Sequence, residues 1–139
     1  MIVRSATSST RRLFGAVLLV VGVAVALAAC GGGGDDSGSK AYVEPKGAST
    51  ETISIDAQNF SFTPDKISAK PGIATIELTA TSGIHDLVFD GAYPGFRLEA
   101  DSGSGTQKLK IDLKPGKYTF YCSYPGHRQA GMEGTLTVS

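Results

Sequence analysis

Four side chains that can bind a soft metal ion are concentrated in one part of the sequence. Cys122, His127 and Met132 fall within eleven residues, and His85 lies upstream of them. Apart from Met1 and Cys30, they are the only Cys, His and Met residues of the chain. One thiolate, two imidazoles and one more distant thioether form the donor set of a blue-copper site. The sequence therefore predicts one copper ion at these four residues.

Each member of this donor set suits a carrier of single electrons. Thiolate and imidazole bind both Cu(I) and Cu(II), and a long thioether contact opposes the tetragonal geometry that Cu(II) alone prefers. One geometry then serves both oxidation states, so little rearranges during electron transfer. Taken singly, Cys122 is explained as a small buried side chain, Met132 as a core filler, and each His as a structural or surface residue. Their joint occurrence in ligand order favours the metal site.

The elements that must position these residues have the pattern of short strands. No stretch after residue 50 keeps a helical period, and Pro-Gly or Asp-Gly pairs mark the turns. The pattern predicts an all-β fold, either an antiparallel β-sandwich or a small barrel. Residues 122–132 then form a loop at one end, and His85 begins a separate strand. Polar and apolar residues alternate in five segments, 52–57, 73–81, 87–89, 108–113 and 135–138.

The first part of the chain predicts export and attachment to a membrane. Residues 1–29 combine a basic start, ending at Arg11-Arg12, with an uncharged apolar run, as in a signal peptide. Residues 10–14 resemble the twin-arginine signal, and residues 27–30 resemble a bacterial lipobox. The lipobox implies cleavage before Cys30, a diacylglycerol on its sulfur, and a lipid-anchored protein in the periplasm or at the cell surface. The alternative is an uncleaved transmembrane helix, since the apolar run is just long enough to cross the hydrocarbon core.

Composition assigns the folded domain to residues 49–139. Residues 30–48, rich in Gly, Ser and Asp, predict a flexible linker. Without residues 1–29 the chain has 10 basic and 13 acidic residues, which argues against a nucleic-acid-binding protein. No CxxC pair, phosphate-binding Gly loop or Ser/His/Asp pattern is present. A Cys–His hydrolase would also lack a recognisable orienting group. We therefore expect a monomer that is not an enzyme.

Nearly all of residues 50–139 resemble the cupredoxin family. Residues 60–67 with 70–72 look like its amino-terminal hairpin, residues 83–89 like its first-ligand strand, and residues 115–122 like its strand into the Cys loop. The most specific feature is the C-x4-H-x4-M spacing. It combines an azurin-like Cys–His spacing with a plastocyanin-like His–Met spacing, as in auracyanin- and rusticyanin-like members. The resemblance implies a Greek-key β-sandwich of about eight strands and the copper ligands His85, Cys122, His127 and Met132.

Together with the export signal, the resemblance implies a membrane-tethered protein that carries electrons between a redox donor and an acceptor. In this family the second His exposes its imidazole edge through an apolar patch, the electron port. Tyr121 would mark a second port, and Arg128 would either favour an acidic partner or be an ordinary solvated charge. Copper storage or delivery with the same ligands is the alternative, although no further Met- or His-rich tract is present. The residues expected around the first port are Ile84, Tyr124, Pro125 and Ala130.

One position departs from the family pattern. The residue after the first His is usually Asn, whose side chain ties that strand to the Cys loop, and here it is Asp86. We expect the carboxylate to accept hydrogen bonds from the backbone or the hydroxyl of Ser123. Its negative charge should favour Cu(II) and lower the reduction potential. The alternative is a surface-exposed Asp86 with no contact to the site.

Overall fold

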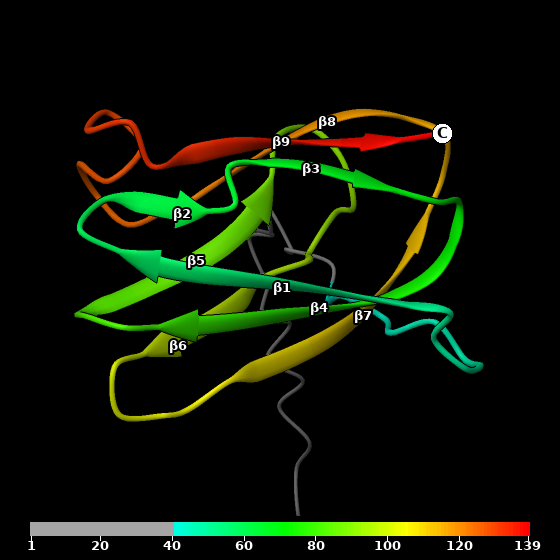
Figure 1. Cartoon of the computed structure of the whole chain (residues 1–139), viewed down its shortest axis with the longest axis horizontal. Helices are drawn as coiled ribbons and strands as arrows, with labels where there is room; N and C mark the ends of the chain where they lie inside the picture. Colours follow the sequence, from blue (N-terminus) through cyan, green and yellow to red (C-terminus); the bar gives the residue numbers. More distant parts are fainter. Residues whose placement is uncertain (1–40) are drawn as a thin grey trace, which may run out of the picture. The chain divides into compact units, whose positions relative to one another are not determined.

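The computed structural model describes residues 41–139, which form nine strands (Figure 1). The predictions for the signal peptide, Cys30 and the linker up to residue 40 lie outside the described residues. Within residues 41–139 no helix has the length and apolar character needed to cross a membrane. The strands are β1 (Glu51–Gln58), β2 (Ser61–Thr63), β3 (Lys66–Ala69), β4 (Gly72–Ala80), β5 (Ile84–Phe89), β6 (Leu98–Asp101), β7 (Gln107–Leu113), β8 (Gly116–Tyr121) and β9 (Glu133–Val138).

The strands form two sheets, with orders β2-β1-β4-β7 and β3-β9-β8-β5-β6. The predicted all-β sandwich is therefore confirmed, with nine strands instead of about eight. Purely antiparallel pairing is wrong, because β1 runs parallel to β4 and β3 runs parallel to β9. Parallel neighbours need a crossover connection, and the chain supplies it by changing sheets between β2 and β3. Residues 60–67, expected to form a hairpin, are thus divided between the two sheets.

The core between the sheets follows from alternating burial along the strands. In β1 every second side chain from Ile53 to Ala57 is buried, and β4 has the same pattern from Ala74 to Ala80. This is the period-two arrangement of a strand with one face on a core. Phe62 and Phe120 meet edge-on across the two sheets, with their ring centroids 5.4 Å apart. Full burial of each large apolar side chain contributes about 1.5–3 kcal/mol.

Residues 41–48 contact the domain, so its ordered part begins earlier than the expected boundary at residue 49. The Tyr42 ring packs edge-on against Phe96 with a centroid separation of 5.1 Å, and its hydroxyl donates to the Lys110 carbonyl at 2.9 Å. The backbone N–H of Lys110 donates to the Glu44 carboxylate at 2.7 Å. Lys110 belongs to β7, an edge strand that pairs with β4 on one side only, so its outward-facing backbone groups have no partner strand. We call residues 41–48 the strap.

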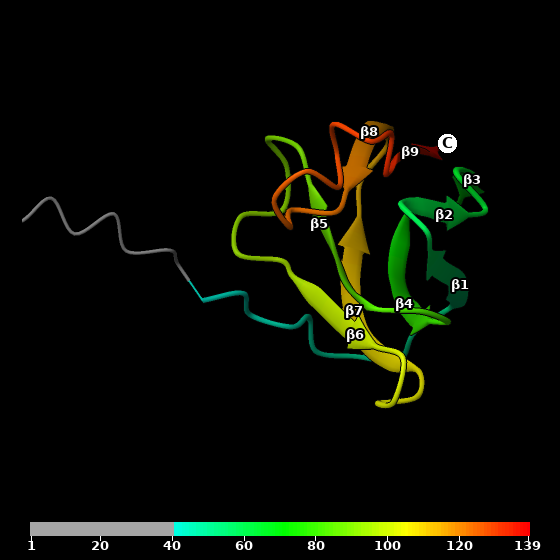
Figure 2. The same cartoon turned by 90° about the vertical axis from the view of Figure 1, so that its left-hand side faces the viewer.

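Three connections meet at one end of the sandwich, on the left in Figure 1. They are the β1–β2 turn, the β4–β5 turn and the loop 122–132 between β8 and β9. Figure 2 looks onto this end, with the loop in orange. β5 starts here and its neighbour β8 ends here, so His85 near the start of β5 lies close to Cys122, which directly follows β8.

The β1–β2 turn has an unusual residue at its second position. Gln58 pairs with Ser61, so Asn59 and Phe60 form a two-residue loop in which both φ angles are positive, 42° and 61°. Such turns favour Asn-Gly because the second residue must also be left-handed. A residue with a side chain costs about 1–2 kcal/mol in that conformation. This turn therefore retains an unfavourable backbone conformation at Phe60.

Candidate metal centre

The start of β5 and the loop 122–132 bring three of the four expected ligands together. The Sγ atom of Cys122 lies 3.2 Å from Nδ1 of His127, and 3.3 Å separates the Nδ1 atoms of His85 and His127. One donor atom from each residue falls within 4.8 Å of the others. Cys122 and His85 are buried, whereas His127 is only partly buried. The geometry offers one sulfur and two imidazole donors to a single ion.

Backbone hydrogen bonds inside the loop fix the position of Met132, the fourth expected ligand. The Cys122 N–H donates to the Met132 carbonyl at 3.1 Å, and the Met132 N–H donates to the His127 carbonyl at 3.1 Å. The Met132 side chain is completely buried. The residue also precedes β9 directly, which anchors this side of the loop. The backbone of Met132 is thus tied to both ligand residues of the loop.

Burial changes the acid–base properties of two of the donors. Burial raises the pKa of the Cys122 thiol, although backbone hydrogen bonds from Asp86 and Tyr124 oppose the change. Burial lowers the pKa of His85, whose bond to the Ser82 carbonyl acts in the opposite direction. That bond, 2.9 Å long, uses Nε2 as donor and leaves Nδ1 unprotonated toward the other donors. A metal ion must therefore displace the thiol proton at neutral pH.

Asp86 links β5 to the ligand loop from a completely buried position. Its carboxylate accepts hydrogen bonds from the Ser123 backbone N–H at 2.6 Å and from the Ser123 hydroxyl at 2.5 Å. The alternative of a surface-exposed Asp86 is wrong, because 0% of the side chain is exposed. The Asp86 backbone N–H also points to Cys122 Sγ at 3.5 Å. Asp86 therefore holds the residue that directly follows Cys122.

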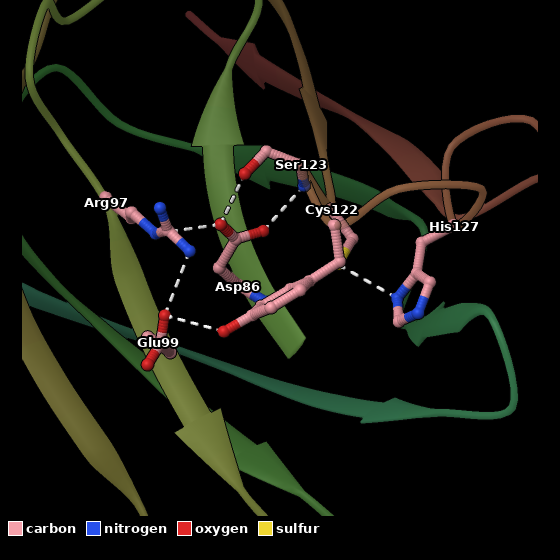
Figure 3. Close-up of polar contacts among 7 residues, drawn as sticks. Asp86, Arg97, Glu99, Cys122, Ser123 and His127 are labelled. Carbon is pink, nitrogen blue, oxygen red and sulfur yellow. Dashed lines mark hydrogen bonds and ion pairs between the residues drawn. The ribbon is translucent and has the colours of Figure 1, made fainter. Parts of the chain in front are cut away.

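An ion pair between Asp86 and Arg97 was not identified from the sequence (Figure 3). The Arg97 Nε atom lies 2.9 Å from Asp86 Oδ2, and its Nη2 atom lies 2.9 Å from Glu99 Oε2. The Tyr124 hydroxyl donates to the same Glu99 oxygen at 2.9 Å. Arg97 precedes β6, a strand too short for a periodic signal. The only hint in the sequence was the charge at position 86 itself.

Two of the expected port residues, Ile84 and Tyr124, adjoin a partly exposed His127. Pro125 and Ala130 are exposed, and Tyr124 is half-buried with its ring centroid 5.7 Å from that of His127. The structure adds Phe60, a 48% exposed side chain whose ring lies edge-on to His127 at 4.8 Å. An open pocket of about 350 Å³ adjoins the imidazoles. Its lining consists of Asn59, Phe60, Ser82, Gly83, Ile84, His85 and His127.

Arg128 covers Tyr121, the residue expected at a second port. The guanidinium carbon lies 4.1 Å from the Tyr121 ring centroid. Its Nη2 and Nε atoms pair with Asp90 at 2.7 Å and with Glu133 at 3.1 Å. A role in attracting an acidic partner needs a positive charge that is not already compensated. Two carboxylates compensate Arg128, so the geometry gives this role little support.

Comparisons with known proteins identify a family for this domain. Residues 49–139 match the model of copper binding proteins of the plastocyanin/azurin family. Plastocyanin from Dryopteris crassirhizoma is 38% identical over 100 residues, which cover 62% of this chain and 95% of that protein. Plastocyanin from Nostoc punctiforme is 32% identical over 108 residues, which cover 66% of this chain and 76% of that protein.

Solved structures show the same fold. Auracyanin A from Chloroflexus aurantiacus, a blue copper protein, superposes with a TM-score of 0.55 at 19% identity, covering 63% of this chain and 98% of that one. Auracyanin B gives a TM-score of 0.54 at 19% identity, covering 73% and 96%. The converging sulfur and imidazole donors fit one type 1 copper ion, because thiolate and imidazole are the ligands that such sites use. The chain belongs to the plastocyanin/azurin family of copper-binding proteins.

Proposed function

We propose that this cupredoxin carries single electrons between redox proteins outside the cytoplasm, with His85, Cys122, His127 and Met132 as its copper ligands. The observation that carries the proposal is the convergence of the Cys122 sulfur and two imidazoles beside an exposed apolar surface. Bound copper supplies one electron by changing between Cu(I) and Cu(II). No step on a bound substrate is part of this function.

The protein's contribution is to keep the donors in one arrangement. The Ser82 carbonyl holds the His85 ring, and the Asp86 carboxylate holds the backbone that follows Cys122. Hydrogen bonds between Cys122, His127 and Met132 close the loop. None of these bonds uses a metal-binding lone pair of the imidazoles, so they persist in both oxidation states. Preorganised donors reduce the rearrangement that accompanies each transfer.

His127 connects the site to the surface where a partner would dock. Its ring is partly exposed and lies between the rings of Phe60 and Tyr124. The adjoining Ile84 side chain is 43% exposed. An apolar surface of this kind loses its water readily on contact, and a small interface permits rapid dissociation. Both properties suit a protein that must exchange partners after each electron.

The sequence of residues 1–30 supports a lipid-anchored protein at the extracytoplasmic face of a bacterial membrane. Changing Cys30 to Ala removes the cysteine of the lipobox-like sequence, which would carry the thioether lipid. The variant should therefore be released from membranes or remain as an uncleaved precursor, as fractionation would show. A processed Cys30→Ala protein that stays in the membrane fraction would favour the retained helix instead.

Copper loading tests the ligand assignment directly. The purified protein with Cu(II) should develop an intense visible band from sulfur-to-copper charge transfer, and ascorbate should bleach it. Cys122→Ser should lose the band completely, because a hydroxyl is not ionised at neutral pH. A colourless, weakly bound complex of the unaltered protein would refute the assignment.

A kinetic comparison separates electron transfer from copper storage or delivery. The loaded protein should exchange electrons with a small redox protein much faster than it loses Cu(I) to a competing chelator. Met132→Gln supplies a harder oxygen donor, so it should lower the reduction potential while copper stays bound. If Cu(I) leaves within the time of one electron exchange, storage or delivery becomes the better description.

A further inference from the structure

The buried Asp86 carboxylate has two hydrogen-bond donors and one ion-pair partner. Oδ1 accepts the Ser123 N–H, Oδ2 accepts the Ser123 hydroxyl, and Arg97 Nε forms an ion pair with Oδ2 at 2.9 Å. The side chain has no exposed area. Water therefore does not screen its charge, and a buried carboxylate without a cationic partner would be strongly unfavourable. Arg97 is the only cation paired with this carboxylate in the described part of the chain.

The Asp86 carboxylate is attached to both sides of the donor set. Asp86 follows His85 in β5, and its own N–H points to the Cys122 sulfur. Its side chain bonds to Ser123, the residue after Cys122. A negative charge in this position stabilises the higher charge of Cu(II) more than that of Cu(I). The positive charge of Arg97 acts in the opposite direction.

The Arg97 guanidinium group lies between the buried Asp86 carboxylate, which Nε contacts, and the exposed Glu99 carboxylate, which Nη2 contacts. Half of the Arg97 side chain is exposed, and Nη2 pairs with Glu99, which is exposed to a similar extent. The Tyr124 hydroxyl bonds to Glu99, and the guanidinium carbon lies 5.5 Å from the Tyr124 ring centroid. Solvent screens the outer Glu99 charge much more than the buried Asp86 charge. The charges of Asp86 and Arg97 should therefore affect the electrostatic potential at the metal site more than the charge of Glu99 does.

We propose that Arg97 is a positioning residue that raises the copper reduction potential by compensating the buried charge of Asp86. The inference rests on the proposed copper ligands and deepens that function. It replaces the expectation that Asp86 lowers the potential by its charge alone. In this protein an Asp–Arg pair occupies the position where the family usually has a neutral Asn.

A double-mutant cycle on the copper-loaded protein tests this proposal. Arg97→Gln leaves Asp86 uncompensated and should shift the Cu(II)/Cu(I) equilibrium about tenfold toward Cu(II), a fall of about 59 mV. Asp86→Asn leaves Arg97 paired only with the exposed Glu99 and should shift the equilibrium toward Cu(I). The double variant should return to within about twofold of the unaltered protein. Arg97→Lys keeps the charge and should restore most of the potential.

A matched control separates this local effect from net charge. Lys108 pairs with Glu77 on the other sheet, at 2.6 Å. Lys108→Gln removes one positive charge, as Arg97→Gln does, and should leave the potential unchanged. If Lys108→Gln shifts the potential as much as Arg97→Gln, the effect is one of overall charge and the proposal is overturned.

The metal-free protein provides an independent readout. Removing Arg97 alone leaves a buried unpaired carboxylate, whereas the double variant does not. Arg97→Gln should therefore unfold at a lower urea concentration than Arg97→Gln with Asp86→Asn. Equal urea midpoints for these two variants would overturn the proposal. It would also be overturned if the reduction potentials of the two single variants shifted in the same direction. A missing visible band in the unaltered protein would instead count against the copper ligands themselves.

Discussion

Replacing Phe60 with Gly or with Ala should separate the cost of its backbone conformation from the benefit of its ring. Both variants lose the half of the ring that is buried, about 1–1.5 kcal/mol. Both also lose the edge-on contact with His127, about 0.5–1.5 kcal/mol. Ala keeps the free-energy cost of the left-handed conformation at φ 61°, whereas Gly adopts this conformation without that cost. After allowance for the greater freedom of Gly in the unfolded chain, this relief is worth about 0.5–1.5 kcal/mol.

The stability of the metal-free variants should therefore follow the order Phe, then Gly, then Ala. At most strand or helix positions Gly is less stable than Ala, so the reversed order is diagnostic. Urea unfolding measures it, provided that the dependence on urea is the same for all variants. Phe60→Ala should lose about 1.5–3 kcal/mol, from the two contributions of the ring. An Ala variant as stable as the Gly variant would refute the account of the turn.

The copper-loaded variants report on the second role of Phe60, which is to cover His127. Removing the ring should increase the rate at which a chelator extracts copper, to the same extent in both variants. Val43→Ala is a suitable control, because Val43 is 83% exposed and belongs to the strap. Different extraction rates for Phe60→Gly and Phe60→Ala would show that the turn conformation, and not the ring, protects the site.

Three further predictions concern the core, the thiol and the strap. Gly134→Ala would place a methyl group against the Phe120 ring in the core, so thermal unfolding should show a loss of about 1–3 kcal/mol or more. Because burial raises the pKa of Cys122, copper binding at pH 7 should release one proton from the thiol, and affinity should fall as the pH is lowered. Proton release measured in weak buffer should be absent in Cys122→Ser. Tyr42→Ala removes an aromatic contact and a hydrogen bond, so urea unfolding should show a loss of about 1–3 kcal/mol, with Val43→Ala nearly unchanged.

The candidate copper ligands could be recognised in the sequence because three of them lie close together in one segment. Cys122, His127 and Met132 are rare residue types in this chain, and their spacing does not depend on any distant contact. Alternation of polar and apolar residues also revealed the longer strands, such as β1 and β4. Local pattern does not say which strand lies next to which, so the parallel pairing of β1 with β4 could not be predicted.

The sequence did not identify the residues that are brought to the site by contacts between distant segments. Arg97 meets Asp86 because β6 pairs with β5, and four residues are too few to show a period. Phe60 meets His127 because the β1–β2 turn lies at the same end as the loop 122–132. Tyr42 was assigned to a flexible linker because its neighbours are small or polar, although its ring packs on Phe96.

β9 is a central strand of its sheet, and the ligand loop is complete only when this strand is paired. β9 lies between β3 and β8, and its first residue, Glu133, pairs with Tyr121 beside the ligand loop. The bond between Cys122 and Met132 closes that loop only once β9 is in place. β9 also pairs with β3, far away in the sequence, and pairing between distant segments is slow. We therefore expect the donors to come together only when β9 has paired, so that copper binds to the folded domain.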